Sequence, residues 1–351
     1  SSSPIVAEIA RRVRSAAGAR RTLVIAENEP QDSNLVRPAE LGGQELDALW
    51  NDDFHHTVRV AATGQTEAYY SDYRGTPQEL ISAIRWGFLF QGQHYVWQNQ
   101  RRGSPGLDLE PRHYIHYIEN HDQLANSGRG DRLHKLTAPG QLRALTALLL
   151  LGPATPMLFQ GQEFAASAPF LYFADHERDV AAKVRAGRRE FLAQFPALAT
   201  AEAQRRLAVP EDPQTFDQCK LDWTELELNH QVFTMHRDLI ALSRADPTLR
   251  ARDRERWHGA VLSPYAFVLR VFGAANDDRL LIVNLGPQLT YQPAPEPLLA
   301  APANRTWRLA WSSEEVRYGG FGTPAVETRQ GWQIPAHAAV VLGPGPALES
   351  P

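Results

Sequence analysis

The sequence predicts an α/β fold followed by a small antiparallel β-sandwich. Within residues 1–252, four apolar runs each end abruptly in polar or charged residues, with helical segments between them. This pattern is typical of consecutive βα units in a parallel barrel or open sheet. From about residue 255, short β-type runs alternate with turns rich in proline and glycine, as in a sandwich. We therefore predict two domains, residues 1–252 and residues 253–351.

The first domain is predicted to open with a helix that has Ser3 as its N-cap and Pro4 at its first helical position. Later apolar runs predict strands, and capped patterns of helical period predict helices. The predicted strands are residues 22–30, 46–56, 114–122 and 155–164, and the predicted helices are residues 76–88 and 139–151.

The second domain contains four runs that favour β-strands, and its last ten residues predict a flexible tail. The runs are YAFVLRVFG, DRLLIVNLG, WRLAWSS and AAVVLGP.

Composition excludes several classes of partner. The net charge is −4 over 351 residues and no basic block stands out, so we expect no nucleic acid. The longest apolar stretch is interrupted by Gly152, Pro153 and Pro156, and the first residues lack a signal-peptide pattern, so we expect no membrane segment.

The single cysteine, Cys219, is compatible with a reducing compartment, which predicts a cytoplasmic location. No phosphate-binding or dinucleotide glycine motif occurs, and we expect no cofactor.

Acidic and amide residues follow all four predicted strands. At the carboxyl ends of parallel strands such residues converge on one face, where α/β barrels carry their chemistry. Each residue taken singly also has a simpler interpretation, as the N-cap of the next helix. The candidates are Glu27 and Glu29, then Asn51, Asp52 and Asp53, then Asn120 and Asp122, then Gln160, Gln162 and Glu163.

Paired carboxylates accompanied by aromatic side chains suit glycosidic bond chemistry. One acid protonates the leaving oxygen while another carboxylate meets an oxocarbenium-like centre. Aromatic residues between the second and third strands, such as Trp50, offer faces for sugar rings, although more than half of them are expected in the core. A metal site is not predicted, because strand alternation sends His113 and His116 to opposite faces and no familiar ligand spacing occurs.

Three stretches resemble the α-amylase superfamily (glycoside hydrolase family 13): LVIAENEP, YIENHDQLANSGRGDRL and MLFQGQEFAASAPFLYFADH. Longer stretches, among them LWNDDFHHTVRVAATGQTEAYYSDY and DPQTFDQCKLDW, resemble its malto-oligosyltrehalose trehalohydrolase family over about residues 1–250. The resemblance implies the C-terminal half of a (β/α)8 TIM-type barrel, about the fifth to eighth strands, before the sandwich. It also implies retaining hydrolysis of the α-1,4 bond beside the terminal trehalose unit of malto-oligosyltrehalose or a related α-glucan.

The same resemblance implies residue roles. Glu27 matches the general acid/base, with Glu29 as the runner-up. Asp122 matches the third acid, which grips sugar hydroxyls, and His121 matches the histidine that assists it. Further implied substrate-binding residues, including those that shape the pocket around the trehalose end, are Gln123, Asn51, Asp52, Phe54 and His55.

Some family features have no counterpart in these 351 residues. The nucleophilic aspartate of the fourth barrel strand and the histidine motif of the third are missing, which implies a chain that is inactive alone and pairs with the N-terminal half of the barrel. Two alternatives remain open: a noncatalytic α-glucan-binding module, or another family 13 hydrolase or branching activity. Smaller departures, which leave the substrate preference open, are Ser127, Gln160, Gln162 and Phe164.

Overall fold

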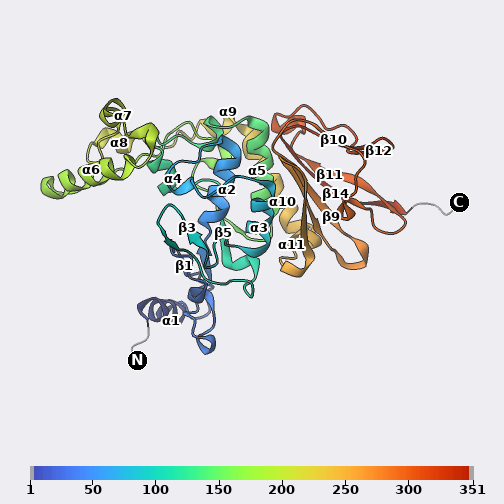
Figure 1. The fold of residues 1–351 in the computed structure, drawn as a ribbon, viewed down its shortest axis with the longest axis horizontal. Helices are drawn as coiled ribbons and strands as arrows, with labels where there is room; N and C mark the ends of the chain where they lie inside the picture. The colour runs from blue at the N-terminus through green and yellow to red at the C-terminus, as the bar shows by residue number, and fades with distance from the viewer. Residues whose placement is uncertain (1–3, 348–351) are drawn as a thin grey trace.

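The computed structural model describes residues 4–347, and its first part is built on a parallel sheet (Figure 1). The sheet has four strands in the order β1-β2-β5-β6, the order in which they occur along the chain. Each strand lies inside one of the predicted runs, which confirms the α/β prediction, although the strands are shorter than the runs. The strands are β1 (Ile25–Ala26), β2 (Ala48–Trp50), β5 (Tyr114–His116) and β6 (Thr155–Pro156).

Helices follow three of these strands. The strands end early because the polar residues after β2 and β5 begin helices: Asn51 caps α2 (Asp52–Thr63) and Asn120 caps α4 (His121–Asn126). The predicted helix at 76–88 is α3 (Pro77–Trp86), and it starts at a capping box formed by Thr76 and Glu79. The predicted helix at 139–151 is α5 (Pro139–Leu151), and α10 (His230–Ala245) follows β6 much later in the chain.

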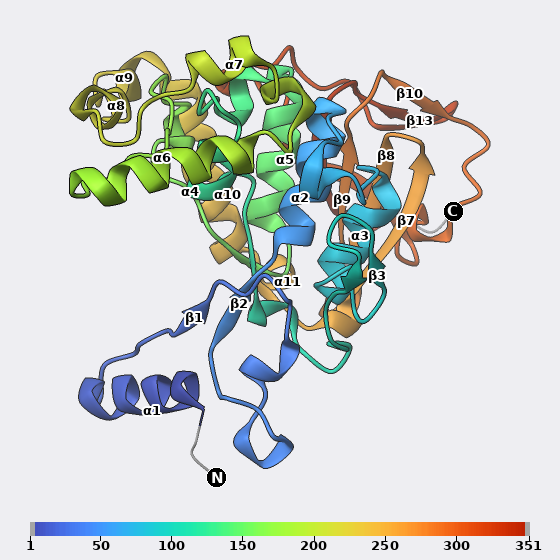
Figure 2. The same cartoon turned by 60° about the vertical axis from the view of Figure 1, so that its left-hand side comes forward.

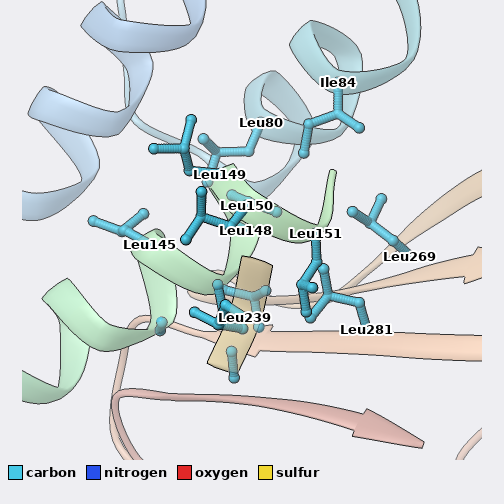
Figure 3. Packing of buried hydrophobic residues seen from close by; sticks show 14 of the residues in the cluster. Leu80, Ile84, Leu145, Leu148, Leu149, Leu150, Leu151, Leu239, Leu269 and Leu281 are labelled. Atoms are coloured by element: carbon cyan, nitrogen blue, oxygen red, sulfur yellow. The ribbon is translucent and has the colours of Figure 1, made fainter. Parts of the chain in front are cut away.

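Helix α5 lies at the centre of the largest hydrophobic cluster (Figure 3). Its residues from Arg143 to Leu151 are all buried, which explains why its sequence is apolar on every side rather than along one stripe. Leu80 and Ile84 of α3 cover one side of it, and Leu269 and Leu281 of the antiparallel sheet cover another. The α/β part and the antiparallel part therefore share one core.

The first helix, α1 (Ile5–Ala17), projects from the body beside β1 (Figure 2). Pro4 is its N-cap rather than its first helical residue, and the predicted cap Ser3 lies outside the described residues. Ala10 is buried against a small cluster formed with residues such as Leu49 and Tyr114. Another face of α1 is exposed and apolar; its residues are Ile5, Ile9 and Val13.

Residues 178–218 form an arm of helices that the sequence did not predict (Figure 1). Only Ala181 and Leu192 of α6 are buried, so the helix has no broad apolar stripe that would reveal it. The arm contains α6 (Arg178–Leu192), α7 (Ala201–Arg206) and α8 (Pro213–Gln218), and α9 (Glu225–Leu228) follows it and contacts α10. Two further elements lie elsewhere, the hairpin β3 (His94–Tyr95) with β4 (Gln100–Arg101), and α11 (Pro247–Arg250).

Two antiparallel sheets form the C-terminal part, where the sequence predicted a small antiparallel β-sandwich. The larger has the order β11-β14-β9-β8-β7 and the smaller β10-β13-β12. One face of the larger sheet packs on the helices, and the other encloses a second cluster with Trp332 and Ile334 of the smaller sheet. The strands are β7 (Trp257–Ser263), β8 (Ala266–Val271), β9 (Arg279–Asn284), β10 (Leu289–Tyr291), β11 (Arg305–Ser312), β12 (Glu327–Thr328), β13 (Gly331–Ile334) and β14 (Ala338–Ala347).

The prediction of a flexible tail is wrong for residues 342–347. Residues 342–347 belong to β14, which pairs with both β9 and β11, because the GPGP turn residues continue an extended ladder instead of ending it. Residues 348–351 lie outside the described part. Among residues 4–347, no helix has the length and apolar character needed to cross a bilayer.

Candidate active site

Glu27 lies directly after β1, and Asp122 is the second residue of α4. The parallel pairing of β1 with β2 and of β2 with β5 places both strand ends on the same edge of the sheet. Asn120 holds the start of α4 by accepting a 3.0 Å hydrogen bond from the backbone N–H of Gln123. This cap fixes the first turn of α4 and with it the backbone positions of His121 and Asp122.

Glu27, His121 and Asp122 form one cluster. A ligand-type atom from each lies within 4.8 Å of the other two, and His121 Nε2 is 3.6 Å from Asp122 Oδ1. The indole of Trp50, the last residue of β2, meets the His121 ring edge-on at 5.7 Å between centroids. The structure thus brings Glu27 next to His121 and Asp122, which follow it almost a hundred positions later in the sequence.

The surroundings of Glu27 raise its pKa, although Glu27 and Asp122 are both exposed among the described residues. Partial burial raises the pKa of Glu27, the negative charge of Asp122 raises it further, and His121 opposes the shift. A carboxyl group with a raised pKa is suited to general acid catalysis, because it keeps its proton to a higher pH than a free carboxyl group. Two carboxylates and an imidazole are also donors that a divalent cation accepts, so the expectation of no metal stays a prediction.

Asp52 lies beside this cluster at the start of α2, and it is half-buried. The hydroxyl of Tyr117 donates a short hydrogen bond to Asp52 Oδ1, and an Arg102 guanidinium nitrogen is 3.4 Å from Oδ2. Burial raises the pKa of Asp52, while the hydrogen bond from Tyr117 and the charge of Arg102 act against that rise. The contacts with Tyr117 and Arg102 therefore fix the orientation of the Asp52 carboxylate, which is a hydrogen-bond acceptor.

A buried network holds Arg102 in place. The neighbouring Asp53 accepts hydrogen bonds from the Tyr73 hydroxyl at 2.5 Å and from the backbone N–H groups of Leu89 and Phe90 at 2.6 and 3.0 Å. Arg102 donates to the Tyr73 hydroxyl at 3.2 Å and stacks 4.6 Å from the centre of the Tyr95 ring. Because every member has partners, the network is rigid and positions Asp52.

Three of the predicted substrate-binding residues are buried beneath the site. Asn51 is an N-cap and also donates to the Gly87 carbonyl at 3.0 Å, while Phe54 stacks on His116 at 4.1 Å inside the main core. His55 stacks on Tyr117 at 5.3 Å, and burial lowers its pKa to about 3, so its ring is neutral at pH 7. These three buried side chains therefore pack beneath the residues of the site.

Gln123 is half-buried, and its Oε1 has no hydrogen-bond partner among the described residues. It lines a cavity of about 90 Å³ together with Tyr69, Tyr70 and Asn126. Asp122 does not line this cavity and Gln123 Oε1 is buried, so a role of Gln123 in substrate binding stays a prediction.

Other candidates lie apart from the cluster. The Glu29 carboxylate accepts a 2.6 Å hydrogen bond from Gln98, and Gln162 is buried, with its Oε1 3.3 Å from the backbone N–H of Phe159. The Gln160 carbonyl accepts from Arg132 at 2.9 Å, whereas Glu163 lines a separate cavity between β6 and α10. Residues after the first three strands thus form or adjoin the cluster, and the candidates after the fourth strand lie apart from it.

Sequence reasoning missed Tyr117 and Arg102. Alternation along the chain after β5 could have revealed Tyr117, because it shares a face with Ile115, next to Ala48 and Trp50 of β2. No local signal marks Arg102, which comes from the end of a two-stranded hairpin and reaches Asp52 only through tertiary packing.

Comparison with known proteins finds relatives over most of the chain. Malto-oligosyltrehalose trehalohydrolase from Deinococcus radiodurans is 36% identical over 288 residues, which cover 80% of this chain and 46% of the relative. The enzyme of that name from Mycobacterium tuberculosis is 32% identical, with 79% and 47% covered. A family model described as a domain of unknown function, DUF3459, matches residues 255–341. A solved structure from Salmonella typhimurium, whose name places it with the alpha amylases, superposes with a TM-score of 0.77 at 28% identity and covers 98% of this chain and 55% of its own.

The chain belongs to the α-amylase superfamily, glycoside hydrolase family 13. An alpha-amylase from H. orenii, at 13% identity and a TM-score of 0.54, shares the fold with 97% of this chain and 56% of its own covered. The α/β part followed by a β-domain is therefore the architecture of the superfamily. The chain spans about half the length of the curated trehalohydrolases it matches.

Proposed function

We propose that the chain is the C-terminal part of a trehalohydrolase-type glycoside hydrolase. This enzyme would cleave the α-1,4 bond next to the terminal trehalose unit of malto-oligosyltrehalose, with retention. The observation that carries the proposal is the raised pKa of Glu27 beside Asp122 at the ends of parallel strands. The names of the related proteins supply the substrate.

The proposed roles follow from the geometry. Glu27, protonated, donates a proton to the leaving glycosidic oxygen and later withdraws one from the attacking water. Asp122 accepts hydrogen bonds from hydroxyls of the distorted sugar, and His121 assists it. Asp52 and Gln123 offer further acceptors to the sugar, while Asn51, Phe54 and His55 hold the pocket in shape from beneath.

The nucleophile is proposed to come from outside these 351 residues, on strands that complete a (β/α)8 barrel. Within the described part, β1 and β6 each pair with one neighbour only, so both edges of the parallel sheet are open. Leu23 and Ile25 are exposed at the β1 edge, and a cavity of about 560 Å³ lined by Leu158 and Phe233 adjoins β6. Open edges and uncovered apolar surface on both sides support a half barrel, and so does the match to half of each relative.

The test is trehalose release from malto-oligosyltrehalose, measured for the 351-residue chain alone and for the longer gene product that contains it. We expect no release from the chain alone and release from the longer product. In the longer product, Glu27→Gln should lower kcat at least about 10³-fold and leave substrate binding intact, since the amide keeps the shape but supplies no proton. Full activity of that variant would contradict the role of Glu27.

The alternative of a noncatalytic α-glucan-binding module makes a different prediction in the same assay. The longer product would bind malto-oligosyltrehalose without releasing trehalose, and Glu27→Gln would change neither property. Release of other maltodextrins instead of trehalose would support a different family 13 hydrolase activity.

A further inference from the structure

One arginine of the arm reaches the short helix that carries His121 and Asp122. Arg188, on α6, donates from Nη1 to Asn126 Oδ1 at 2.6 Å and from Nη2 to the carbonyl of Ala125 at 3.2 Å. Asn126 is the last residue of α4, and Ala125 directly precedes it. Figure 1 shows α4 where the arm meets the body. Arg188 therefore bridges the arm and the C-terminal end of α4.

Helix α4 needs support at both ends. It has six residues, and a helix this short is not stable by itself. The Asn120 cap holds its first turn, but the carbonyls of its last turn have no partners within the helix. Arg188 donates to one of them, that of Ala125, and the Ser127 hydroxyl donates to another, that of Leu124, at 2.7 Å. The arm thus supplies part of what holds the end of α4.

The position of Asp122 depends on the backbone of this helix. The Asp122 side chain is 53% exposed, and the imidazole 3.6 Å from its carboxylate belongs to the neighbouring His121 on the same helix. Little packing from the rest of the protein holds the carboxylate, so a shift of α4 would move it. A displacement of about 1 Å at a reacting group can cost about 10²-fold in rate.

Arg188 is held firmly enough to act as an anchor. Its guanidinium carbon lies 4.5 Å from the centre of the Tyr172 ring, in a cation–π contact. One turn further along α6, Leu192 is buried in a cluster with Phe195 and with Tyr69 of the body. The rings of Tyr69 and Phe195 meet edge-on at 5.4 Å between centroids. The arm is therefore packed against the body beside the bridge.

The charge of Arg188 also suits this place. Burial lowers the pKa of Arg188, while the neighbouring Tyr172 and Asp122 oppose that change. An attraction therefore acts between the guanidinium and the carboxylate of Asp122, in addition to the two hydrogen bonds to α4.

We propose that Arg188 is a positioning residue for Asp122. It fixes the last turn of α4, as Asn120 fixes the first, and so holds the Asp122 carboxylate where it meets the sugar hydroxyls. The part that this plays in hydrolysis rests on the proposed function, whereas the bridge itself rests on the two hydrogen bonds.

The first test uses the 351-residue chain and needs no activity. Arg188→Met keeps most of the side-chain length but removes the charge and both donors. Amide hydrogen exchange of residues 123–127, followed by mass spectrometry, should become at least about tenfold faster in this variant. Arg189→Met is the matched control, because Arg189 is exposed on the same helix. It should exchange like the parent.

The second test measures trehalose release by the longer gene product. Arg188→Met should lower kcat about 10- to 100-fold with little change in KM, because the geometry of the transition state is lost while ground-state binding is kept. Arg188→Lys should fall between the parent and Arg188→Met, because one ammonium group cannot donate in a fork to both acceptors. Arg189→Met should retain the parent's kcat and KM.

Parent-like exchange of residues 123–127 in Arg188→Met would overturn the bridge. A raised KM with unchanged kcat would overturn the positioning role and make Arg188 a substrate-binding residue. Asn126→Ala removes one acceptor without changing α6 and should also lower kcat, so it replaces Arg188→Met if thermal unfolding shows that the latter is not folded; a parent-like kcat there would overturn the proposal. If the longer parent releases no trehalose, the hydrolysis fails, and the exchange measurement still decides whether Arg188 holds α4.

Discussion

At the scale of single residues, the site depends on carboxylates that alter each other's proton affinity. Partial burial of Glu27 and the charge of the neighbouring Asp122 both raise the pKa of Glu27. His121 works in the opposite direction. Substitution of Asp122 and substitution of His121 should therefore shift the pKa of Glu27 in opposite directions.

We predict that Asp122→Asn lowers the pKa of Glu27 and that His121→Gln raises it. The first removes a negative charge that favours the protonated acid, and the second removes a group that favours the carboxylate. A ¹³C NMR titration of the Glu27 carboxyl carbon measures both, with Asp217→Asn on α8 as a control that should leave it unchanged. In the active enzyme the rate should fall as pH rises through the raised pKa, because a general acid loses its proton there. Shifts of the same sign in both variants would contradict this account.

Tyr117 makes a second prediction at this scale. Tyr117→Phe removes the hydroxyl that donates to Asp52, so the pKa of Asp52 should rise and the free energy of unfolding should fall by about 1–3 kcal/mol. Urea denaturation measures the loss. Tyr265→Phe is the control, since Tyr265 is an exposed tyrosine of the C-terminal part. An equal change in both variants would mean that Asp52 does not depend on this hydrogen bond.

At the scale of elements, a buried ion pair joins the ends of β5 and β6. Arg132 lies 3.4 Å from Glu119 and donates to the carbonyls of Gln160 and Ala168 at 2.9 and 2.7 Å. Glu119 directly precedes the cap of α4, so this link fixes the loop that carries His121 and Asp122. Breaking it should loosen the fold and the site together.

We predict that Arg132→Met lowers the free energy of unfolding by about 3–5 kcal/mol, because it leaves the carboxylate of Glu119 buried and unpaired. Adding Glu119→Gln should recover part of the loss, since the neutral amide is cheaper to bury. The matched control is Arg206→Met, which breaks an exposed pair with Glu202 and should cost at most about 1 kcal/mol. Chemical denaturation measures all three, and similar losses in the two single variants would refute the prediction.

Elements that carry their own pattern could be predicted from the sequence. The β2 and β5 runs, the capping box of α3 and the apolar α5 each have a local signal, and the acids after the strands pointed to Glu27 and Asp122. Asn51 and Asn120 show that the simpler N-cap interpretation was also correct for some of them. Arg102 could not be predicted, because its partner Asp52 is fifty residues away and only packing brings them together.

At the scale of the whole molecule, one hydrophobic cluster runs from α2 and α3 through α5 into the inner face of the larger antiparallel sheet. The Arg143–Glu314 pair, 2.6 Å apart and mostly buried, crosses the same boundary. Neither part can lose its packing without exposing the core of the other, so the two parts should unfold as one unit.

Leu148→Ala tests this coupling, because Leu148 lies on α5 inside the shared cluster. The cavity should lower the free energy of unfolding by about 2–5 kcal/mol, and the loss should appear as a single transition. Far-ultraviolet circular dichroism and tryptophan fluorescence, followed through the same urea titration, should give coincident midpoints. Leu309→Ala, on an exposed position of β11, should change the midpoint little. Two separated transitions in Leu148→Ala would show that the antiparallel part keeps its own core, and that the shared cluster joins two units which fold independently.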